Sequence, residues 1–410
     1  MGSVSQSSHF EAAESVEPDG IFEVLRRYNA DASPNKINVC VGAYRDENGK
    51  PWVLPSVQMA TSKIAGADHE YLPMMGSRGF RDAAVELLFH GSRALSEQRI
   101  SGIQSLSGTG ALLLAGMTLK KATANIQHIY ITSPTWPNHE LLFDTMGFNV
   151  HWAPYYNNKT RSYDHEAFLA SLAAAEPNSA VVLHACAHNP TGCDPTREQW
   201  TEIAQAIRSR GIFPIFDSAY LGFNSGSVDE DAWAIRHFID DLGMEAAICL
   251  SFAKSMGLYG ERIGAVLFVA ATSELSGTLQ SILENAQRAT ISTPPLYGAR
   301  IAEAVLTSTD IKKQWAEDLV TMSGRILKMR GRLFQELTRL GTPGSWEHIV
   351  KQTGMFGYLG IGAEQVVHLE KEFNVYMANT SRISIAGLND NNVEHFAKAL
   401  DATARKFAGN

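Results

Sequence analysis

The chain has 410 residues, of which 45% are hydrophobic and 19% charged, and its formal net charge is -8. This length and composition allow a large buried core and predict a globular protein of two domains. The negative charge and the lack of a Lys/Arg cluster interleaved with aromatic residues exclude a typical nucleic-acid-binding protein.

The N-terminal segment and the hydropathy of the chain bear on its location. No apolar run approaches the roughly 18 to 20 residues that a membrane-spanning helix needs. The first twenty residues have no apolar signal core and are acidic, and Gln6 does not fit the myristoylation pattern that would begin at Gly2. We therefore expect a cytoplasmic protein that binds no membrane.

Cysteine usage gives a second indication of the compartment. The four cysteines are scattered, with no C-x-x-C pair. This pattern predicts free thiols in a reducing compartment and favours neither a disulfide framework nor a metal site. The cysteines are Cys40, Cys186, Cys193 and Cys249.

The middle of the chain alternates β-rich runs with amphipathic helical patterns. The predicted strands are 129–132, 181–184, 212–216, 248–252 and 263–269. A helix is predicted over 196–210, with a start at Asp194-Pro195-Thr196 and a stop at Gly211. Such alternation predicts an α/β domain with a mostly parallel sheet flanked by helices, in which ligands lie at the carboxyl ends of the strands.

The pattern changes after about residue 310. One long helix is predicted over 310–340, followed by strands near 355–358, 375–377 and 382–386 and a last helix over 391–406. We interpret this part as a smaller α+β domain that the N-terminal segment completes. The large domain is placed at 51–321, and the small domain at 1–50 together with 322–410.

Three polar features lie at the ends of predicted strands. The sequence SGTGA at 107–111 opens a helical run and offers free main-chain N–H groups to an anion such as phosphate. Asp217 ends a hydrophobic strand, and Lys254 follows another. A phosphate cradle, an acid and an amine at one edge of a sheet meet the needs of pyridoxal 5′-phosphate.

Each feature alone has an ordinary interpretation. The glycine-rich turn lacks the third glycine of a dinucleotide fingerprint. Asp217 could be a turn residue and Lys254 a surface residue, and His184 and His188 are each expected to be structural histidines with satisfied hydrogen bonds. Only the combination of the three features favours a cofactor site.

The sequence resembles the aspartate aminotransferases, pyridoxal-phosphate enzymes of fold-type I and class I, and in particular their eukaryotic cytosolic type. The resemblance extends over almost the whole chain, from 38–45 to 381–383. It rests on six motifs in family order: SGTGA, SPTWPNH, HACAHNPTG, FDSAY, SFAK and GERIG.

The resemblance implies roles for residues around the cofactor. Lys254 would hold the cofactor covalently and then move a proton at the substrate, which requires a pKa lowered toward neutrality. Asp217 would pair with the pyridine nitrogen, making the ring an electron sink. Tyr220 and Asn189 would bond its 3′ oxygen, and Trp136 would stack on the ring. The phosphate would be held by Ser107, Gly108, Thr109, Ser251 and Arg262, with Tyr71 from a neighbouring subunit.

Substrate recognition is likewise implied by the resemblance. Arg382 would bind the α-carboxylate through its guanidinium fork, and Arg288 of a partner subunit would bind the distal carboxylate. By itself, Arg288 reads as a helix-surface residue. Gly42 and Asn138 also match positions near the substrate carboxylates, and Trp136 and Asn189 would contact the substrate as well as the cofactor. The shared sites imply a homodimer.

Several positions depart from the expected family pattern. Thr293 and Ser384 stand where asparagine is common, Cys40 occupies a customary glycine position, and 74–78 reads MMGSR. These positions adjoin substrate-facing segments, although none removes a catalytic group.

Three functions are weighed against this pattern. The first is amino transfer between L-aspartate and 2-oxoglutarate by a ping-pong mechanism. The second is a related enzyme specialised for aromatic or unusual amino acids, or for elimination or decarboxylation. The third is a non-catalytic scaffold, and the presence of Lys254, Asp217 and Arg382 argues against it.

Overall fold

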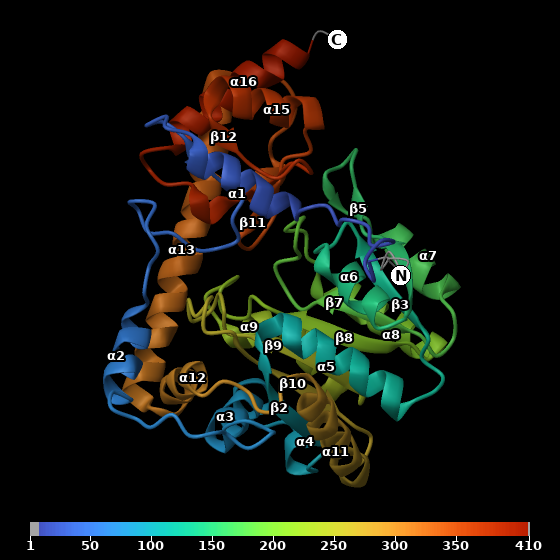
Figure 1. Ribbon diagram of the computed structural model, residues 1–410. Coiled ribbons are helices and arrows are strands. Elements are labelled where there is room, and N and C mark those ends of the chain that lie inside the picture. Colours follow the sequence, from blue (N-terminus) through green and yellow to red (C-terminus); the bar gives the residue numbers. More distant parts are fainter. Residues whose placement is uncertain (1–7, 409–410) are drawn as a thin grey trace, which may run out of the picture.

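The computed structural model describes residues 8–408. A large lower part contains the central sheet, and a smaller upper part contains both the N-terminal helix and the C-terminal helices (Figure 1). The long helix α13 (Thr309–Leu340) runs from one part into the other. Within residues 8–408, no helix is long and apolar enough to cross a membrane.

The central sheet has seven strands in the order β2-β10-β9-β8-β7-β3-β4. Strand β10 is antiparallel to both of its neighbours, and the other pairs are parallel. The α/β fold with a mostly parallel sheet is thus confirmed, and the predicted strand 263–269 matches β10 residue for residue. The strands are β2 (Ile100–Leu106), β3 (His128–Ser133), β4 (Asn149–Pro154), β7 (Ala180–His184), β8 (Phe213–Ser218), β9 (Ala246–Ser251) and β10 (Ile263–Val269).

Helices pack against the sheet and extend the lower part. Strands β7, β9 and β10 are buried along their whole length, which explains their nearly continuous apolar sequence. The helices of the lower part are α2 (Pro55–Lys63), α3 (Arg78–Phe89), α4 (Arg93–Ser96), α5 (Ser107–Ala122), α6 (Asn138–Thr145), α7 (His165–Ala174), α8 (Arg197–Arg210), α9 (Val228–Asp231), α10 (Trp233–Arg236), a π-helical turn (His237–Asp241), α11 (Ser273–Thr290) and α12 (Tyr297–Thr307).

Local sequence signals set several helix ends. Thr196 caps α8 in a capping box with Gln199, and Gly211 ends the helix in a left-handed conformation with φ 64°. The long helix α13 ends in the same way at Gly341. These ends agree with the helices predicted over 196–210 and 310–340.

The upper part contains two short sheets, and the first of them joins the two ends of the chain. Strand β1 (Ile37–Asn38) pairs in parallel with β12 (Val375–Tyr376), and β11 (Phe356–Tyr358) pairs with β13 (Arg382–Ser384). The other elements of this part are α1 (Gly20–Ala30), α14 (His348–Lys351), α15 (Ala363–Phe373), a 3-10 turn (Ile385–Gly387) and α16 (Val393–Phe407). A hairpin of β5 (Tyr156–Asn157) and β6 (Ser162–Tyr163) extends from the lower part.

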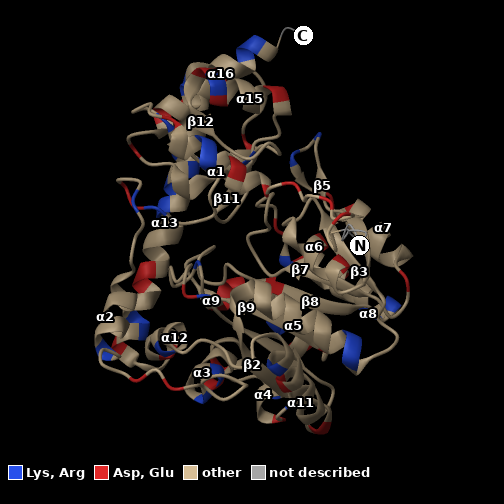
Figure 2. Cartoon of the chain, in the orientation of Figure 1, with Lys and Arg blue, Asp and Glu red and all other residues tan. Residues whose placement is uncertain are grey.

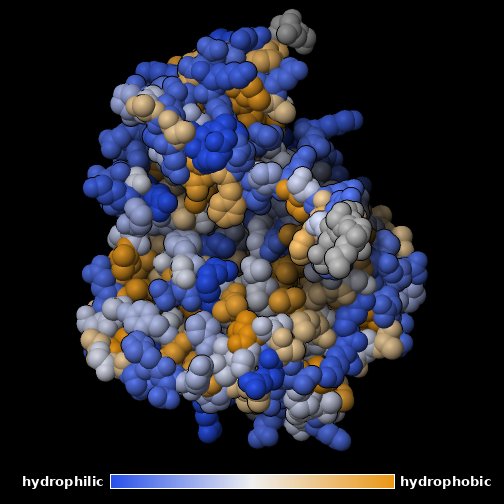
Figure 3. All heavy atoms as spheres, in the orientation of Figure 1, coloured by the Kyte–Doolittle hydropathy of each residue, from blue (hydrophilic) through white to orange (hydrophobic). Residues whose placement is uncertain are grey.

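The surface and the thiols agree with the composition of the chain. Lys and Arg are interspersed with Asp and Glu over the chain (Figure 2). Hydrophilic residues cover most of the outer surface in the view of Figure 3, and hydrophobic residues appear where the upper part meets the lower part. All four cysteines are buried and free. Residues 1–7, which entered the expectation of a cytoplasmic location, lie outside the described residues.

Candidate active site

The predicted phosphate turn lies where β2 passes into α5. Ser107 begins the helix with φ 58°, and Leu106 before it provides no side-chain cap. The first N–H groups of α5 therefore remain available to an anion, and the helix dipole adds positive potential there. A left-handed Ser107 is a strained conformation of a kind that is common at ligand sites.

Strands β9 and β10 pack against this turn and hold it in place. The Ser107 hydroxyl lies 2.7 Å from that of Ser251, at the end of β9. A Cβ added to Gly264 in β10 would lie 2.8 Å from Ser107 Cα. A Cβ added to Gly108 in α5 would lie 3.4 Å from Ser251 Cβ. The glycine at position 264 is required because the turn packs directly on the strand.

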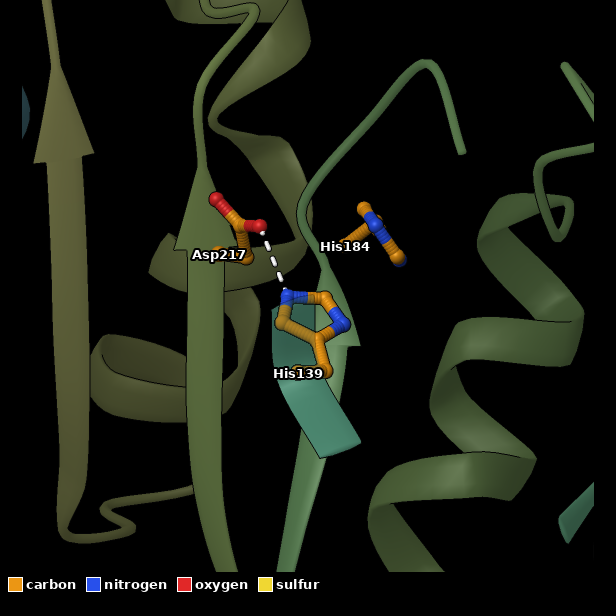
Figure 4. Close-up of side chains that lie close together, drawn as sticks. All are labelled: His139, His184 and Asp217. Carbon is orange, nitrogen blue, oxygen red and sulfur yellow. Dashed lines mark hydrogen bonds and ion pairs between the residues drawn. The ribbon is translucent and has the colours of Figure 1, made fainter. Parts of the chain in front are cut away.

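The predicted acid lies beside two buried histidines (Figure 4). Asp217 in β8 is opposite His184 at the end of β7. Its Oδ2 lies 3.0 Å from Nε2 of His139 in α6, and the Nδ1 of His139 lies 2.8 Å from the Thr135 hydroxyl. Burial acts to raise the pKa of Asp217, but the hydrogen bond and charge of His139, followed by the charge of Lys254, bring that pKa below its ordinary value.

His184 differs from its predicted structural role. Both ring nitrogens are buried and have no hydrogen-bond partner among residues 8–408. Burial lowers the pKa of His184 to about 3, so the ring is neutral at physiological pH. His188 does have the expected satisfied contacts, to the hydroxyls of Thr132 at 2.9 Å and Thr191 at 2.8 Å. The expectation of satisfied hydrogen bonds for His184 is therefore wrong: at the end of β7, opposite Asp217, its nitrogens reach no donor or acceptor of the described chain within hydrogen-bonding distance.

The same cluster has a spacing that a metal ion could use. One ligand atom each from His139, His184 and Asp217 lie within 4.8 Å of one another. His139 already uses Asp217 in a hydrogen bond, so a metal would have to displace that contact. The arrangement is better suited to keeping a carboxylate ionised for a cationic partner.

Lys254 lies three residues beyond the end of β9 and is half-buried. Its amine is 5.0 Å from the centre of the Tyr220 ring. Burial lowers the pKa of Lys254, Asp217 opposes this change, and the charges of Arg262 and Arg382 add to it. A lowered pKa makes a larger fraction of the amine neutral and nucleophilic.

Arg382 brings the upper part of the molecule to this edge of the sheet. It lies in β13, donates to the main-chain oxygen of Cys40 at 2.8 Å and to Oδ1 of Asn189 at 3.4 Å, and packs 4.3 Å from the Phe356 ring centre. Its Nε is buried and has no hydrogen-bond partner in the described chain. A buried guanidinium with an unused donor is suited to a carboxylate ligand.

Three further predicted residues surround the same space. Trp136 is half-buried, with its ring at 87° to that of His139 and a centroid distance of 5.4 Å. Asn138 begins α6 beside it. Gly42 lies close to Phe356, whose Cζ would be 2.9 Å from an added Cβ. A side chain at position 42 would therefore force the Phe356 ring, and with it the Arg382 environment, to shift.

Three of the predicted residues are exposed. Tyr71 is 91% exposed, and Arg288, in the last turn of α11, donates only to the Ser292 hydroxyl within residues 8–408. Arg262 is also exposed, has φ 52°, and donates to the main-chain oxygen of Tyr259 at 3.1 Å. The chain thus gathers Ser107, Asp217, Lys254 and Arg382 near one edge but leaves Tyr71 and Arg288 on the surface.

Sequence reasoning did not find the partner of the acid. His139 stands in the SPTWPNH motif, but it is separated from Asp217 by 78 residues. Its spacing from Thr135, four residues earlier in a turn that leads into a helix, is the only local signal of a held imidazole. The sequence could identify this pair only if it were known that α6 packs beside the end of β8.

Comparison with known proteins places the chain in a family. Residues 34–400 match the family described as aminotransferase class I and II. The cytoplasmic aspartate aminotransferase of Schizosaccharomyces pombe is 44% identical over 406 residues, covering 97% of this chain and 98% of that protein. The chain therefore belongs to the class I and II aminotransferase family, as its resemblance to aspartate aminotransferases predicted.

Solved structures agree with the fold. The aspartate aminotransferase from Saccharomyces cerevisiae cytoplasm superposes with a TM-score of 0.94 at 41% identity, covering 97% of this chain and 99% of that one. An aromatic-amino-acid aminotransferase from Burkholderia pseudomallei, covalently bound to pyridoxal phosphate, also gives 0.94, at 36% identity and the same coverage. The fold-type I assignment is confirmed, and the backbone fold is shared by enzymes named for different substrates.

Proposed function

We propose that the protein catalyses reversible amino transfer between L-aspartate and 2-oxoglutarate, giving oxaloacetate and L-glutamate. The observation that carries this proposal is the placement of Asp217, Lys254 and the Ser107 turn at one edge of the sheet, with Arg382 facing them. The relatives named as aspartate aminotransferases over nearly the full chain support the substrate pair. Their cytoplasmic names also support a cytoplasmic location.

The residues present fit pyridoxal 5′-phosphate, the cofactor of this family. The first N–H groups of α5, with Ser107, Gly108, Thr109, Ser251 and Arg262, would hold its phosphate. Asp217, kept ionised by His139, would face the ring nitrogen, and Tyr220 and Asn189 its 3′ oxygen. When bound, the cofactor supplies an electron sink for the substrate's Cα electrons.

The protein's own groups would then bind the substrate and move the proton. Arg382 would hold the α-carboxylate, because its guanidinium retains an unused donor and sits in a buried position. Lys254, with its lowered pKa, would take the proton from the substrate Cα and return it to the cofactor carbon that receives the amino nitrogen. Trp136 would cover one face of the ring and exclude water.

A homodimer is part of the proposal. Tyr71 and Arg288 are exposed in the chain, and the resemblance assigns both to the neighbouring subunit's site.

We further propose that the chain divides into a large domain at 51–321 and a small domain formed by 1–50 together with 322–410. The Arg382 to Asn189 contact would then join the small domain to the large one, and closure would exclude water from bound substrate.

A specialised enzyme for aromatic amino acids is the alternative. The Burkholderia pseudomallei aromatic-amino-acid aminotransferase has the same TM-score to this chain as the Saccharomyces cerevisiae aspartate aminotransferase, and this supports the alternative. Of the departures from the family pattern, Cys40 does not weaken the α-carboxylate contact, because Arg382 bonds its main-chain oxygen, which any residue provides.

The test is an absorbance spectrum of the purified protein before and after adding L-aspartate. Loss of the visible band of the bound cofactor, with stoichiometric release of oxaloacetate, is the expected result. A visible band that L-aspartate leaves unchanged but L-phenylalanine removes would overturn the dicarboxylate assignment in favour of the alternative. A protein with no visible band after incubation with pyridoxal 5′-phosphate would overturn the cofactor assignment itself.

A further inference from the structure

The outer edge of the central sheet is closed by an unusual set of side-chain contacts. Strand β2 is the last strand on its side of the sheet, so the outward main-chain groups of Gly102 and Gln104 have no strand to pair with. Gly102 N donates to Oε1 of Gln280 at 3.0 Å, and Gly102 O accepts from Arg81 at 3.4 Å. These contacts close the edge at one position.

At Gln104 the edge is closed by two loops and a helix end. Its main-chain N donates to Met75 O at 3.0 Å, and its main-chain O accepts from Nε2 of Gln287 at 2.8 Å. Its side chain, fully buried, accepts from Ser77 N at 3.2 Å and donates to Pro295 O at 2.6 Å. One residue thus uses both main-chain and side-chain groups to hold two segments that are far apart in sequence.

The two segments are those that follow Tyr71 and Arg288. Gly76 approaches so closely that an added Cβ would lie 2.3 Å from Gln104 Cβ, and its φ is +88°. On the other side, Gln287 is 1% exposed and immediately precedes the exposed Arg288, whose guanidinium donates to Ser292 in the same loop. Ser107, three residues after Gln104 in the sequence, begins the phosphate turn.

We infer that Gln104 is a positioning residue that sets the location of the Tyr71 segment, the Arg288 segment and the phosphate turn relative to one another. Its side-chain amide bonds the first two segments, its main chain continues into the phosphate turn, and a buried amide with both of its ends bonded allows little freedom to either loop. The inference rests on the proposed function, because it concerns the loops assigned there to substrate and cofactor.

The choice of amide is specific. A carboxylate at this position would still accept from Ser77 N but would repel Pro295 O, and an apolar side chain of the same length would bond neither. Gln104→Met should therefore release both segments, whereas Gln104→Glu should release only the segment at 291–295. The matched control is Gln280→Met, which removes a glutamine contact to the same strand edge but touches neither loop.

The first measurement is amide hydrogen exchange by mass spectrometry on the full-length protein. In Gln104→Met, exchange over 73–77 and 291–295 should rise together by about tenfold, while Gln280→Met leaves both segments as in wild type. Release of only one segment in Gln104→Met, or equal release in both variants, would overturn the inference. Gln104→Glu keeps the test informative if Gln104→Met does not fold.

The second measurement separates positioning from general damage. Gln104→Met should raise KM for L-aspartate by about tenfold with a much smaller change in kcat, and should leave KM for an aromatic amino acid nearly unchanged. Equal losses for both substrates would overturn the role of Gln104 in placing the Arg288 segment. If wild-type protein does not transaminate L-aspartate, the proposed function fails, whereas the exchange experiment still decides whether Gln104 couples the loops.

Discussion

Two regions of the molecule contain the proposed site residues, and the side chains in these regions differ in burial and in their contacts with the rest of the chain. At the carboxyl edge of the sheet, Asp217 and Ser107 are buried and bonded to other parts of the same chain. On the surface, Tyr71 is 91% exposed and Arg288 contacts only its own loop in the described residues. In the proposed homodimer, one subunit would therefore supply most of the cofactor side, and the second copy would add Tyr71 at the phosphate and Arg288 at the distal carboxylate.

The largest expected effect comes from removing the amine in the buried region. Lys254→Ala should lower kcat for L-aspartate on the order of 10⁴-fold, because the amine with a lowered pKa at this edge of the sheet is lost. Steady-state rates and rapid-mixing absorbance would measure it. Lys120→Ala, which removes a half-buried lysine bonded to Gln127 and to the main-chain oxygen of Gly147, is the control and should have wild-type rates. Activity within tenfold of wild type in Lys254→Ala would show that another group moves the proton.

The next effect tests the acid and its support. Asp217→Asn should lower kcat about 10³-fold, because a neutral amide does not stabilise a protonated ring nitrogen. His139→Asn should lower it only about tenfold, since His139 acts through Asp217 rather than on the reacting atoms. The pH dependence of the cofactor's absorbance should shift in both variants. A larger loss in His139→Asn than in Asp217→Asn would contradict this order.

A third prediction sharpens the comparison at the exposed region. Arg288→Ala should lower kcat/KM for L-aspartate roughly 10²-fold, because a charge-assisted contact to the distal carboxylate is lost, and should affect an aromatic substrate far less. Similar losses on both substrates would remove the reason for this assignment.

The shared site can be tested directly with mixed dimers. Lys254→Ala and Arg288→Ala subunits, unfolded and refolded together in equal amounts, should recover about a quarter of the wild-type activity, because a hybrid dimer has one intact site. Each variant refolded alone is the control. A mixture no more active than the two variants would show that Arg288 serves its own subunit's site.

The smallest effect concerns stability outside both regions. His348, in α14, is 6% exposed, and burial, followed by the charge of Arg161, lowers its pKa to about 4 from 6.5. The folded state therefore binds the proton less well than the unfolded state, so its contribution to stability is full above pH 6.5 and is lost as pH falls toward 4. The loss is at most about 3 kcal/mol.

Chemical denaturation across this pH range would measure it. His348→Asn should show a flatter dependence of the free energy of unfolding on pH than wild type. Equal slopes in wild type and His348→Asn would contradict the assigned shift.

The sequence was a reliable guide to elements and to residues at strand ends. The strand over 263–269 and the helix ends at Thr196 and Gly211 followed from hydrophobic runs and capping residues, which act over a few residues of chain. Asp217 and Lys254 were found because the carboxyl ends of strands in an α/β sheet meet at one edge. The role of Arg288 came only from the family resemblance, since its helix position gives no sign of a ligand.

Tertiary structure alone decided which side chains meet. Neither the antiparallel direction of β10, the contact of His139 with Asp217, nor the unpartnered nitrogens of His184 could be read from local pattern. Backbone sterics and apolar periodicity are local and fix where helices and strands form. Contacts between residues far apart in the chain depend on strand order and helix packing. The sequence therefore determined most of the elements of this protein, although the strands β2 and β4 were not predicted, and the tertiary structure determined its site.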